Sequence, residues 1–257
     1  MKRSNLVITI LLFILAALCF IFFEAIPTTI VSDPIANHLL CGFIARLGLS
    51  LLFGWTLYLF AGKSMFTFNK TFAVNLVWSL PCFMVALVNF PYSAIISKEV
   101  TIDYANLLGL YILFVISIAL LEEFIFRGIV LLVVKDYLNG KKHAPLKIVV
   151  ICSAIFSLFH LTNLLTPNPD VGGVLLQCVY TFLIGAMLTV TMLKLKNIWL
   201  CIVIHAIFDF GGLLTIHQIG SGNPWDTLFW ILTIVSGVLC AGHIIYTLIK
   251  LEKDYAS

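Results

Sequence analysis

The sequence LLEEFIFRG, from Leu120 to Gly128, places three ionisable side chains inside an apolar segment that runs from Leu107 to Val134. Glu123 and Arg127 are four residues apart with the acid first, which is the favoured orientation for an ion pair within a helix. Glu122 lies about 100° around the helix from Glu123. It can therefore face a different neighbour, which leaves one carboxylate for structure and one for chemistry.

Three further ionisable residues lie in two later apolar segments. His160 falls within 146–165, and His205 and Asp209 fall on one helix face within 197–216. At about 1.5 Å rise per residue, these residues and Glu122 lie roughly 12–20 Å from the same side of the predicted membrane. Polar residues in membrane spans can also simply join helices by hydrogen bonds. Because burying a whole set of ionisable groups at one depth is costly, the sequence favours a shared functional site.

Hydrolysis of a peptide bond is a reaction that this set supports. The reaction needs an activated water, a donor that stabilises the oxyanion of the tetrahedral intermediate, and a proton for the leaving amine. A buried carboxylate such as Glu122 can act first as base and then as acid, beside His160 and His205. The preferred interpretation requires no cofactor.

Two other chemistries use the same segments. Glu122, His160, His205 and Asp209 together offer two carboxylates and two imidazoles, a set from which a divalent metal such as zinc could take its ligands. No HExxH motif accompanies them. Cys201 lies four residues before His205 and is a candidate nucleophile. Since seven cysteines are scattered singly through the apolar segments, one such spacing is expected by coincidence.

The elements that position these residues must be membrane helices. Of 257 residues, 61% are hydrophobic and 11% are charged, and the mean hydropathy is +1.11. A soluble domain carries about 25% charged residues, so the composition predicts a polytopic membrane protein. The net charge of +3 gives no indication of a nucleic-acid partner.

About 20 predominantly apolar residues are needed to cross a bilayer as a helix. Eight segments approach this length: 5–24, 39–61, 72–90, 106–134, 146–165, 171–194, 197–216 and 225–249. The predicted fold class is therefore all-α, a membrane bundle of about eight transmembrane helices in a single domain over residues 1–257. Pro81 lies inside the third segment and predicts a kink there. The first segment is longer than the apolar region of a signal peptide and no A-x-A site follows it, which favours an uncleaved span.

The basic residues outside these segments fall almost entirely on one side of the predicted membrane. Lys98 is assigned to one side, and the other side receives Lys2, Arg3, Lys63, Lys70, Lys135, Lys141, Lys142, Lys147, Lys194, Lys196, Lys250 and Lys253. By the positive-inside rule the basic side is cytoplasmic, and both termini lie there.

A few residues outside the main set carry open alternatives. Arg46, within the second segment, is interpreted either as a gate or substrate contact or as a partner of Asp33 or a snorkelling side chain. His38 and His217 are predicted to be loop or interfacial residues. Gly211 and Gly212 would permit close helix approach or locally irregular backbone.

Three motifs in this order resemble those of the CPBP family of intramembrane proteases (CAAX prenyl proteases and bacteriocin-processing enzymes), also called the Abi family. The family pattern is EExxxR, then FxxxH, then HxxxN or HxxxD, each on a membrane helix. Here the pattern is present as Glu122-Glu123 with Arg127, as Phe156 with His160, and as His205 with Asp209. The resemblance covers approximately residues 106–212, the predicted catalytic core.

The resemblance implies a role for each of these residues. Glu122 would be the general base that activates water, with His160 helping to polarise it. His205 and the residue at 209 would line the site and stabilise the oxyanion, and Arg127 would hold Glu123. The prenyl-protease branch typically has Asn where this chain has Asp209. Since an ionised Asp cannot donate a hydrogen bond, Asp209 must be protonated, orient His205 or bind a metal.

The preferred function is therefore an intramembrane endopeptidase that cleaves membrane-associated or membrane-bound peptides, in a bacterial plasma membrane. One alternative is a non-catalytic membrane scaffold or regulator on the same fold, acting in bacteriocin immunity or with a membrane signalling partner. A proton-coupled transporter is a third class, although no paired repeats with interrupted helices are found.

Overall fold

The computed structural model describes residues 28–67, 72–166, 169–217 and 219–256. The first predicted span, 5–24, lies outside them. The described elements, in chain order, are α2 (Pro34–Ala61), η1 (Lys63–Met65), α3 (Phe72–Trp78), α4 (Leu80–Val88), α5 (Tyr92–Ile96), β1 (Val100–Ile102), η2 (Ala105–Leu107), α6 (Leu108–Glu123), η3 (Phe124–Val130), α7 (Leu131–Tyr137), α8 (Ala144–Phe159), η4 (His160–Leu165), α9 (Val171–Leu195), α10 (Ile198–Gly212), β2 (Gly220–Gly222) and α11 (Thr227–Ala256). The predicted all-α class is confirmed, with one short antiparallel pair of strands, β1 and β2, added to it.

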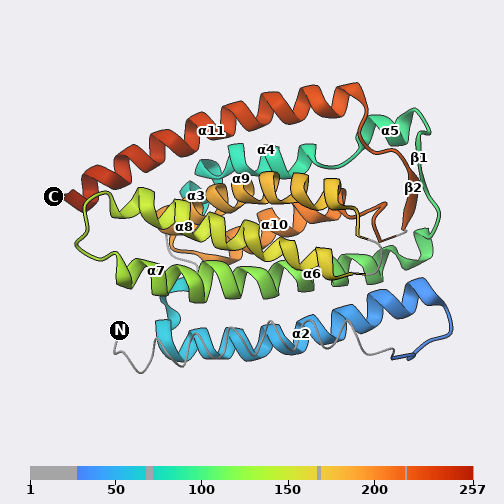
Figure 1. The fold of residues 1–257 in the computed structure, drawn as a ribbon, viewed down its shortest axis with the longest axis horizontal. Helices are drawn as coiled ribbons and strands as arrows, with labels where there is room; N and C mark the ends of the chain where they lie inside the picture. The colour runs from blue at the N-terminus through green and yellow to red at the C-terminus, as the bar shows by residue number, and fades with distance from the viewer. Residues whose placement is uncertain (1–27, 68–71, 167–168, 218, 257) are drawn as a thin grey trace.

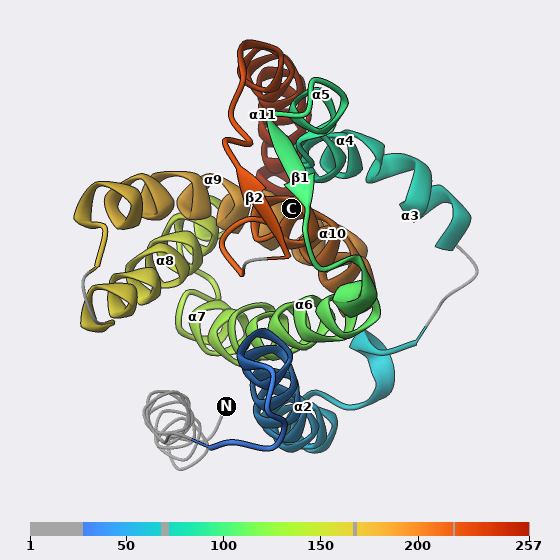
Figure 2. The same ribbon diagram turned by 90° about the vertical axis from the view of Figure 1, so that its right-hand side faces the viewer.

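The long helices lie side by side along one axis, as Figure 1 shows. α2 packs on α6, and α11 packs on α4, α8 and α9. α10 contacts α4, α6 and α9 and lies near the middle of the bundle when viewed end-on (Figure 2). The helix that carries His205 and Asp209 is therefore held by helices from three sides of the chain's fold, α4, α6 and α9.

Five helical segments in the described part of the chain are long and apolar enough to cross a membrane: Pro34–Leu59, Ala105–Tyr137, Ala144–Leu165, Val171–Leu195 and Thr227–Tyr255. They correspond to the second, fourth, fifth, sixth and eighth predicted spans. The bent pair Phe72–Trp78 and Leu80–Ile96 makes a sixth if it is counted as one span, and it corresponds to the third. The chain is an integral membrane protein.

The second span begins at Pro34, five residues earlier than predicted from hydropathy. The side chain of Asp33 accepts a hydrogen bond from the backbone N–H of Ala36, and Pro34 occupies the first helical position. Both features stabilise a helix start, since the first backbone N–H groups have no partner within the helix. Asp33 is thus the N-cap of α2.

The third span is bent by 53° between α3 and α4. The break falls at Ser79, and Pro81 lies in the first turn of α4. Proline lacks the N–H that would continue the upstream helix, so the kink predicted from Pro81 is confirmed.

The predicted seventh span was too long. α10 begins after Asn197, whose side chain accepts from the N–H of Leu200, but it ends at Gly212 after 15 residues. Gly211 and Gly212 pack against the end of α4: a Cβ on Gly211 would lie 2.6 Å from the carbonyl oxygen of Asn89. The two glycines therefore serve close helix approach, one of the alternatives left open by the sequence.

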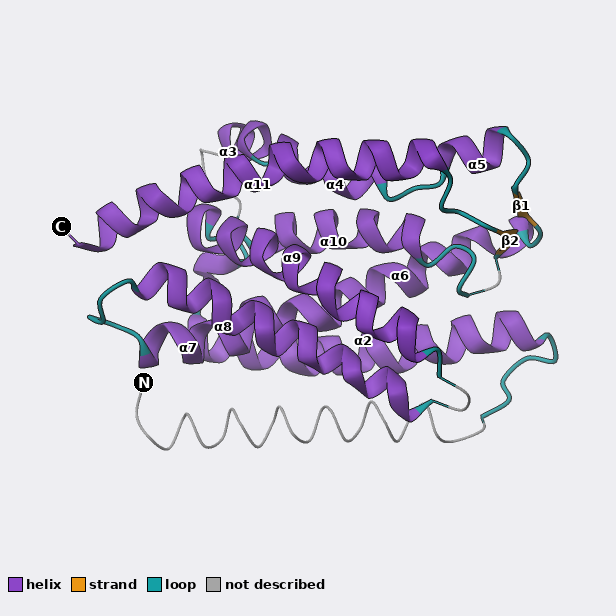
Figure 3. Cartoon of the chain, turned by 45° about the horizontal axis from the view of Figure 1, so that its top comes forward, coloured by secondary structure: helices purple, strands orange, loops and turns teal. Residues whose placement is uncertain are grey.

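Loops gather at the two ends of the bundle (Figure 3). The C-terminal ends of α2, α7, α9 and α11, which precede or carry the lysine-rich segments, lie at one end (Figure 1). The β1–β2 pair, which joins Val100 to Gly222, lies at the opposite end. The segregation of basic segments inferred from the sequence is thus matched by the arrangement of the helices.

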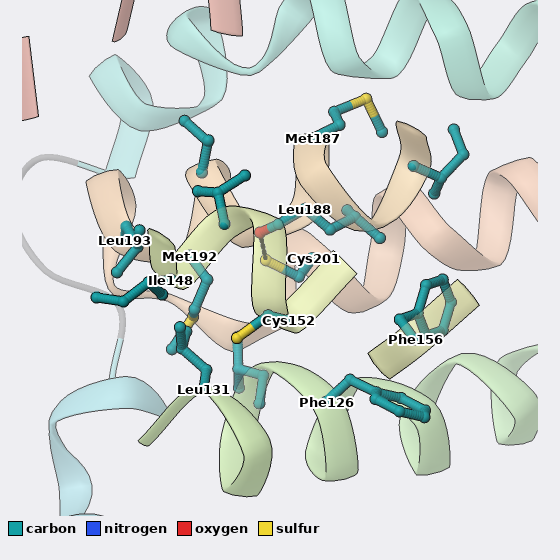
Figure 4. Close-up of a cluster of buried hydrophobic side chains, with 14 of the residues drawn as sticks. Phe126, Leu131, Ile148, Cys152, Phe156, Met187, Leu188, Met192, Leu193 and Cys201 are labelled. Atoms are coloured by element: carbon teal, nitrogen blue, oxygen red, sulfur yellow. Dashed lines mark hydrogen bonds between the residues drawn. The ribbon is translucent and has the colours of Figure 1, made fainter. Parts of the chain in front are cut away.

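A continuous apolar core joins α6 to α10 (Figure 4). Phe126 and Phe156 pack edge to face with ring centroids 4.9 Å apart. Close packing of this kind resists changes of even one methylene, so the core holds the backbone segments that carry the ionisable residues in fixed positions.

Candidate active site

Glu122 and Glu123 end α6, and a seven-residue π-helix, η3, follows them directly. A continuous α-helix was predicted here. π-helical turns are rare and recur at functional sites, because the extra residue per turn changes which side chains share a face. The irregular segment carries Arg127, so the π-helix sets where the guanidinium meets its partners.

The predicted ion pair between Glu123 and Arg127 is present and completely buried. Arg127 Nη1 donates to Glu123 Oε1 over 2.7 Å, and the two side chains are 1% and 0% exposed. The same carboxylate oxygen lies 2.7 Å from His205 Nδ1 on α10. Since a carboxylate oxygen only accepts, His205 carries a proton on Nδ1 and donates it to Glu123. Glu123 therefore fixes both Arg127 and the ring of His205.

Phe156 organises the cation side of this cluster. The Arg127 guanidinium carbon lies 4.3 Å from the centre of the Phe156 ring. Within the described residues, Arg127 Nε and Nη2 are buried without a hydrogen-bond partner. The cation–π contact with the Phe156 ring therefore stabilises this part of the guanidinium. The Phe156 ring is nearly perpendicular to the rings of His160 and His205, with centroids 4.9 Å and 5.9 Å away. The sequence places Phe156 in the FxxxH motif, four residues before His160, but this role depends on tertiary contacts with Arg127 and His205.

The second nitrogen of His205 faces two more carboxylates. Nε2 lies 3.4 Å from Asp209 Oδ2 and 3.7 Å from Glu122 Oε2. Glu122 and Asp209 are 20% and 15% exposed, in contrast to the fully buried Glu123. The two carboxylates that are accessible to a ligand are thus separated from the buried carboxylate by the imidazole ring.

His160 stands at the junction of α8 and η4. Its Nδ1 lies 2.9 Å from the carbonyl oxygen of Phe156. Because that oxygen can only accept, Nδ1 carries the proton, and Nε2 of the neutral ring is left to accept a hydrogen bond. His160 also interacts electrostatically with Glu122. The structure therefore gathers the residues expected from all three motifs into one region.

The end of α10 is held by side chains that sequence inspection did not single out. Asn89 Nδ2 donates to the carbonyl oxygen of Phe208, and the Tyr111 hydroxyl donates to that of Phe210, both over 2.7 Å. These two carbonyls flank Asp209. The two bonds fix the backbone of the residue whose carboxylate faces His205.

Metal binding and thiol chemistry were the two rival mechanisms. Among the described residues, no three His, Cys, Asp or Glu side chains converge as a metal-ligand group, so the set of Glu122, His160, His205 and Asp209 does not fit zinc in this arrangement. The Cys201 thiol is fully buried and donates to the carbonyl oxygen of Leu188 on α9, as the dashed line in Figure 4 shows. That bond engages the thiol in helix packing.

The N-terminal half of α2 contributes to a second polar cluster. Arg46 is buried, with its guanidinium carbon 5.0 Å from the centre of the Phe114 ring. His38 Nε2 lies 3.2 Å from His217 Nδ1, and the two rings stack. These histidines join α2 to the segment after α10. The prediction that they are loop or interfacial residues did not include this contact, because nothing local in the sequence pairs residues 179 positions apart.

The geometry and the motifs agree with a comparison against known families. Residues 104–211 match the family described as type II CAAX prenyl endopeptidase Rce1-like. The segment is an Rce1-like domain. It contains every residue of the three motifs, so the CPBP family expected from them is confirmed. Comparison with curated proteins and with solved structures gives no match.

Proposed function

We propose that this protein is an intramembrane endopeptidase that hydrolyses peptide bonds of membrane-associated or membrane-bound peptides. The observation that carries the proposal is the position of His205. Its ring is anchored by Glu123 through Nδ1 and faces Glu122 and Asp209 through Nε2. A buried imidazole with one nitrogen held by a carboxylate and the other directed at accessible carboxylates is suited to stabilising charge that develops on a substrate.

In this proposal Glu122 is the general base. A water lies between Glu122 and His160, where the unprotonated Nε2 of His160 accepts one of its hydrogen bonds. Glu122 removes a proton from the water as the oxygen attacks the carbonyl carbon of the peptide bond. The protonated Glu122 then gives the proton to the leaving amine, which breaks the C–N bond and restores the carboxylate.

His205 stabilises the oxyanion in the same scheme. In its doubly protonated form the ring donates from Nδ1 to Glu123 and from Nε2 into the site. A donor placed at the developing oxyanion typically contributes about 2.7–4 kcal/mol to transition-state stabilisation. Asp209 accepts from Nε2 before substrate binds, which is the orienting role among the alternatives set out for this residue. Arg127 balances the charge of Glu123, so that Glu123 remains an acceptor.

The proposal includes the arrangement in the membrane. The basic segments at one end of the bundle favour cytoplasmic termini, and about eight spans result when 5–24, the bent pair and the short α10 are counted. We place the protein in a bacterial plasma membrane, with the bilayer and a membrane peptide as its partners and no nucleic acid.

The test compares membrane peptides from cells that contain the parent protein, the Glu122→Gln variant or neither. Peptides that are shortened only with the parent protein support proteolysis and identify the substrates. An effect on the cell that persists in Glu122→Gln and His160→Asn, without any change in the peptides, would replace the proposal with the scaffold or regulator in bacteriocin immunity or signalling. Cleavage lost on chelation and restored by zinc would assign the water to a metal instead.

A further inference from the structure

Three polar side chains that the proposed mechanism does not use lie beside the active site. Asn163 Nδ2 donates to Gln177 Oε1 over 2.8 Å, which joins η4 to α9. Tyr180 follows Gln177 by three residues on α9, so the two side chains are neighbours on one face of that helix. All three side chains are partly exposed, and Tyr180 is 36% exposed. We call this row of side chains the polar strip.

The polar strip leads to the catalytic residues. Tyr180 interacts electrostatically with both Asp209 and Glu122, and its ring lies 6.2 Å from that of Phe208, the neighbour of Asp209. At its other end, Asn163 follows His160 by three residues in the 3-10 helix η4. Side chains three residues apart in a 3-10 helix eclipse one another. Asn163 therefore projects from the same side of η4 as His160.

Two of these side chains, Gln177 and Tyr180, are placed where polar groups are costly. Gln177 and Tyr180 are the seventh and tenth residues of α9, which puts Tyr180 about 14 Å along the axis of a membrane-spanning helix. Partly exposed amides and hydroxyls within a span are expected to have a ligand or a functional role, since lipid offers them no hydrogen bonds. All three groups are uncharged. They match a ligand with alternating neutral donors and acceptors, and the main chain of a peptide is such a ligand.

The spacing along η4 fits an extended peptide. One turn of a 3-10 helix advances about 6 Å, from the level of His160 to that of Asn163. Alternate residues of an extended chain are roughly 6.6 Å apart. A peptide whose cleaved bond lies at His160 and Glu122 would therefore present the main-chain groups of the second residue along to the amide of Asn163.

We propose that Asn163, Gln177 and Tyr180 form a subsite that hydrogen-bonds the main chain of the peptide substrate, with Asn163 contacting it two residues from the cleaved bond. The assignment rests on the proposed function and extends it from a reaction to a mode of recognition. Recognition through the main chain by neutral groups would tolerate many side-chain sequences.

The test uses full-length protein in nanodiscs and a fluorescent N-acylated peptide, prepared also as a series in which one backbone nitrogen at a time is methylated. Binding is measured with Glu122→Gln, so that turnover is not required, and hydrolysis with the parent protein. Asn163→Leu, Gln177→Leu and Tyr180→Phe are each expected to raise Kd, and KM where cleavage occurs, by about three- to tenfold with kcat unchanged. Tyr246→Phe on the exposed face of α11 is the matched control and should change neither.

The methylated series distinguishes a direct contact from a structural effect. One methylated position, two residues from the cleaved bond, should weaken binding to Glu122→Gln and should have no further effect when Asn163→Leu is also present. Additive losses, unchanged affinities, a drop in kcat alone, or no peptide binding at all would each overturn the subsite. The effects of backbone methylation and of the polar-strip variants on Kd could be non-additive even though the parent protein cleaves no peptide. In that case the subsite stands and the proposed hydrolysis fails.

Discussion

Removal of the Arg127 guanidinium is the sharpest perturbation of the buried cluster. In Arg127→Met the carboxylate of Glu123 keeps its bond to His205 but loses its bond to Arg127. Among the described contacts of Glu123, Arg127 is the only side chain that always carries a positive charge. Both partners are essentially inaccessible to water, at 1% and 0% exposure. Breaking one half of such a buried pair typically costs about 3–5 kcal/mol of unfolding free energy, because the remaining charge is left uncompensated. The loss of contact with the Phe156 ring adds to this cost.

The measurement is the unfolding free energy in mixed micelles, from titration with a denaturing detergent. Because the cost comes from an uncompensated charge, the double variant with Glu123→Gln and Arg127→Met should recover a large part of the loss. Lys250→Met, at the exposed end of α11, serves as the control and should change stability by less than about 1 kcal/mol. A change below about 1 kcal/mol for Arg127→Met, or a double variant less stable than the single one, would refute the buried-pair account.

Three other predictions follow from contacts around the site. Asp209→Asn should retain cleavage within about tenfold, since the amide oxygen can still accept from Nε2 of His205, whereas Asp209→Ala removes that acceptor and should lose about 10²-fold or more in kcat, measured on the same reconstituted protein. Gly211→Ala should lower the unfolding free energy by about 1–3 kcal/mol, because the added Cβ meets the backbone of Asn89 and Phe90 at 2.6 Å, whereas Gly237→Ala, which has no such neighbour, should not. Burial, followed by the charges of His38 and Arg46, lowers the pKa of His217 to about 3. Because the unfolded chain binds the proton more readily, stability should fall as the pH drops from about 6.5 towards 3, by at most about 1.4 kcal/mol per pH unit, and the fall should be smaller in His217→Gln. Equal pH dependence in the two proteins would contradict the last prediction.

Hydropathy and proline position predicted much of the fold, because each depends on local sequence. The spans at Ala144–Leu165 and Val171–Leu195 agree with the predicted limits to within two residues. The end of α10 could not be obtained in this way. It is set by the contact of Gly211 with the end of α4, and the residues in that contact are more than 100 positions apart.

The candidate site shows the same division between local and distant signals. Spacing of four residues predicted the Glu123–Arg127 pair, since i,i+4 neighbours meet on a helix. The second role of Glu123, as the acceptor for His205, depends on how α10 packs against α6 and was not foreseen. The π-helix after Glu123 and the contact of Arg127 with Phe156 likewise depend on tertiary packing.

Glu122 is the centre of the proposed mechanism, and one measurement tests it most directly. The rate of peptide cleavage is compared between the parent protein and Glu122→Gln, each reconstituted in vesicles with a chelator present. Because Glu122 is partly exposed and lies 3.7 Å from His205, its amide should leave the fold intact, as checked by detergent unfolding. The account predicts a loss of at least about 10²-fold in kcat, as expected for removal of a general base. Cleavage by Glu122→Gln at the parental rate would contradict it.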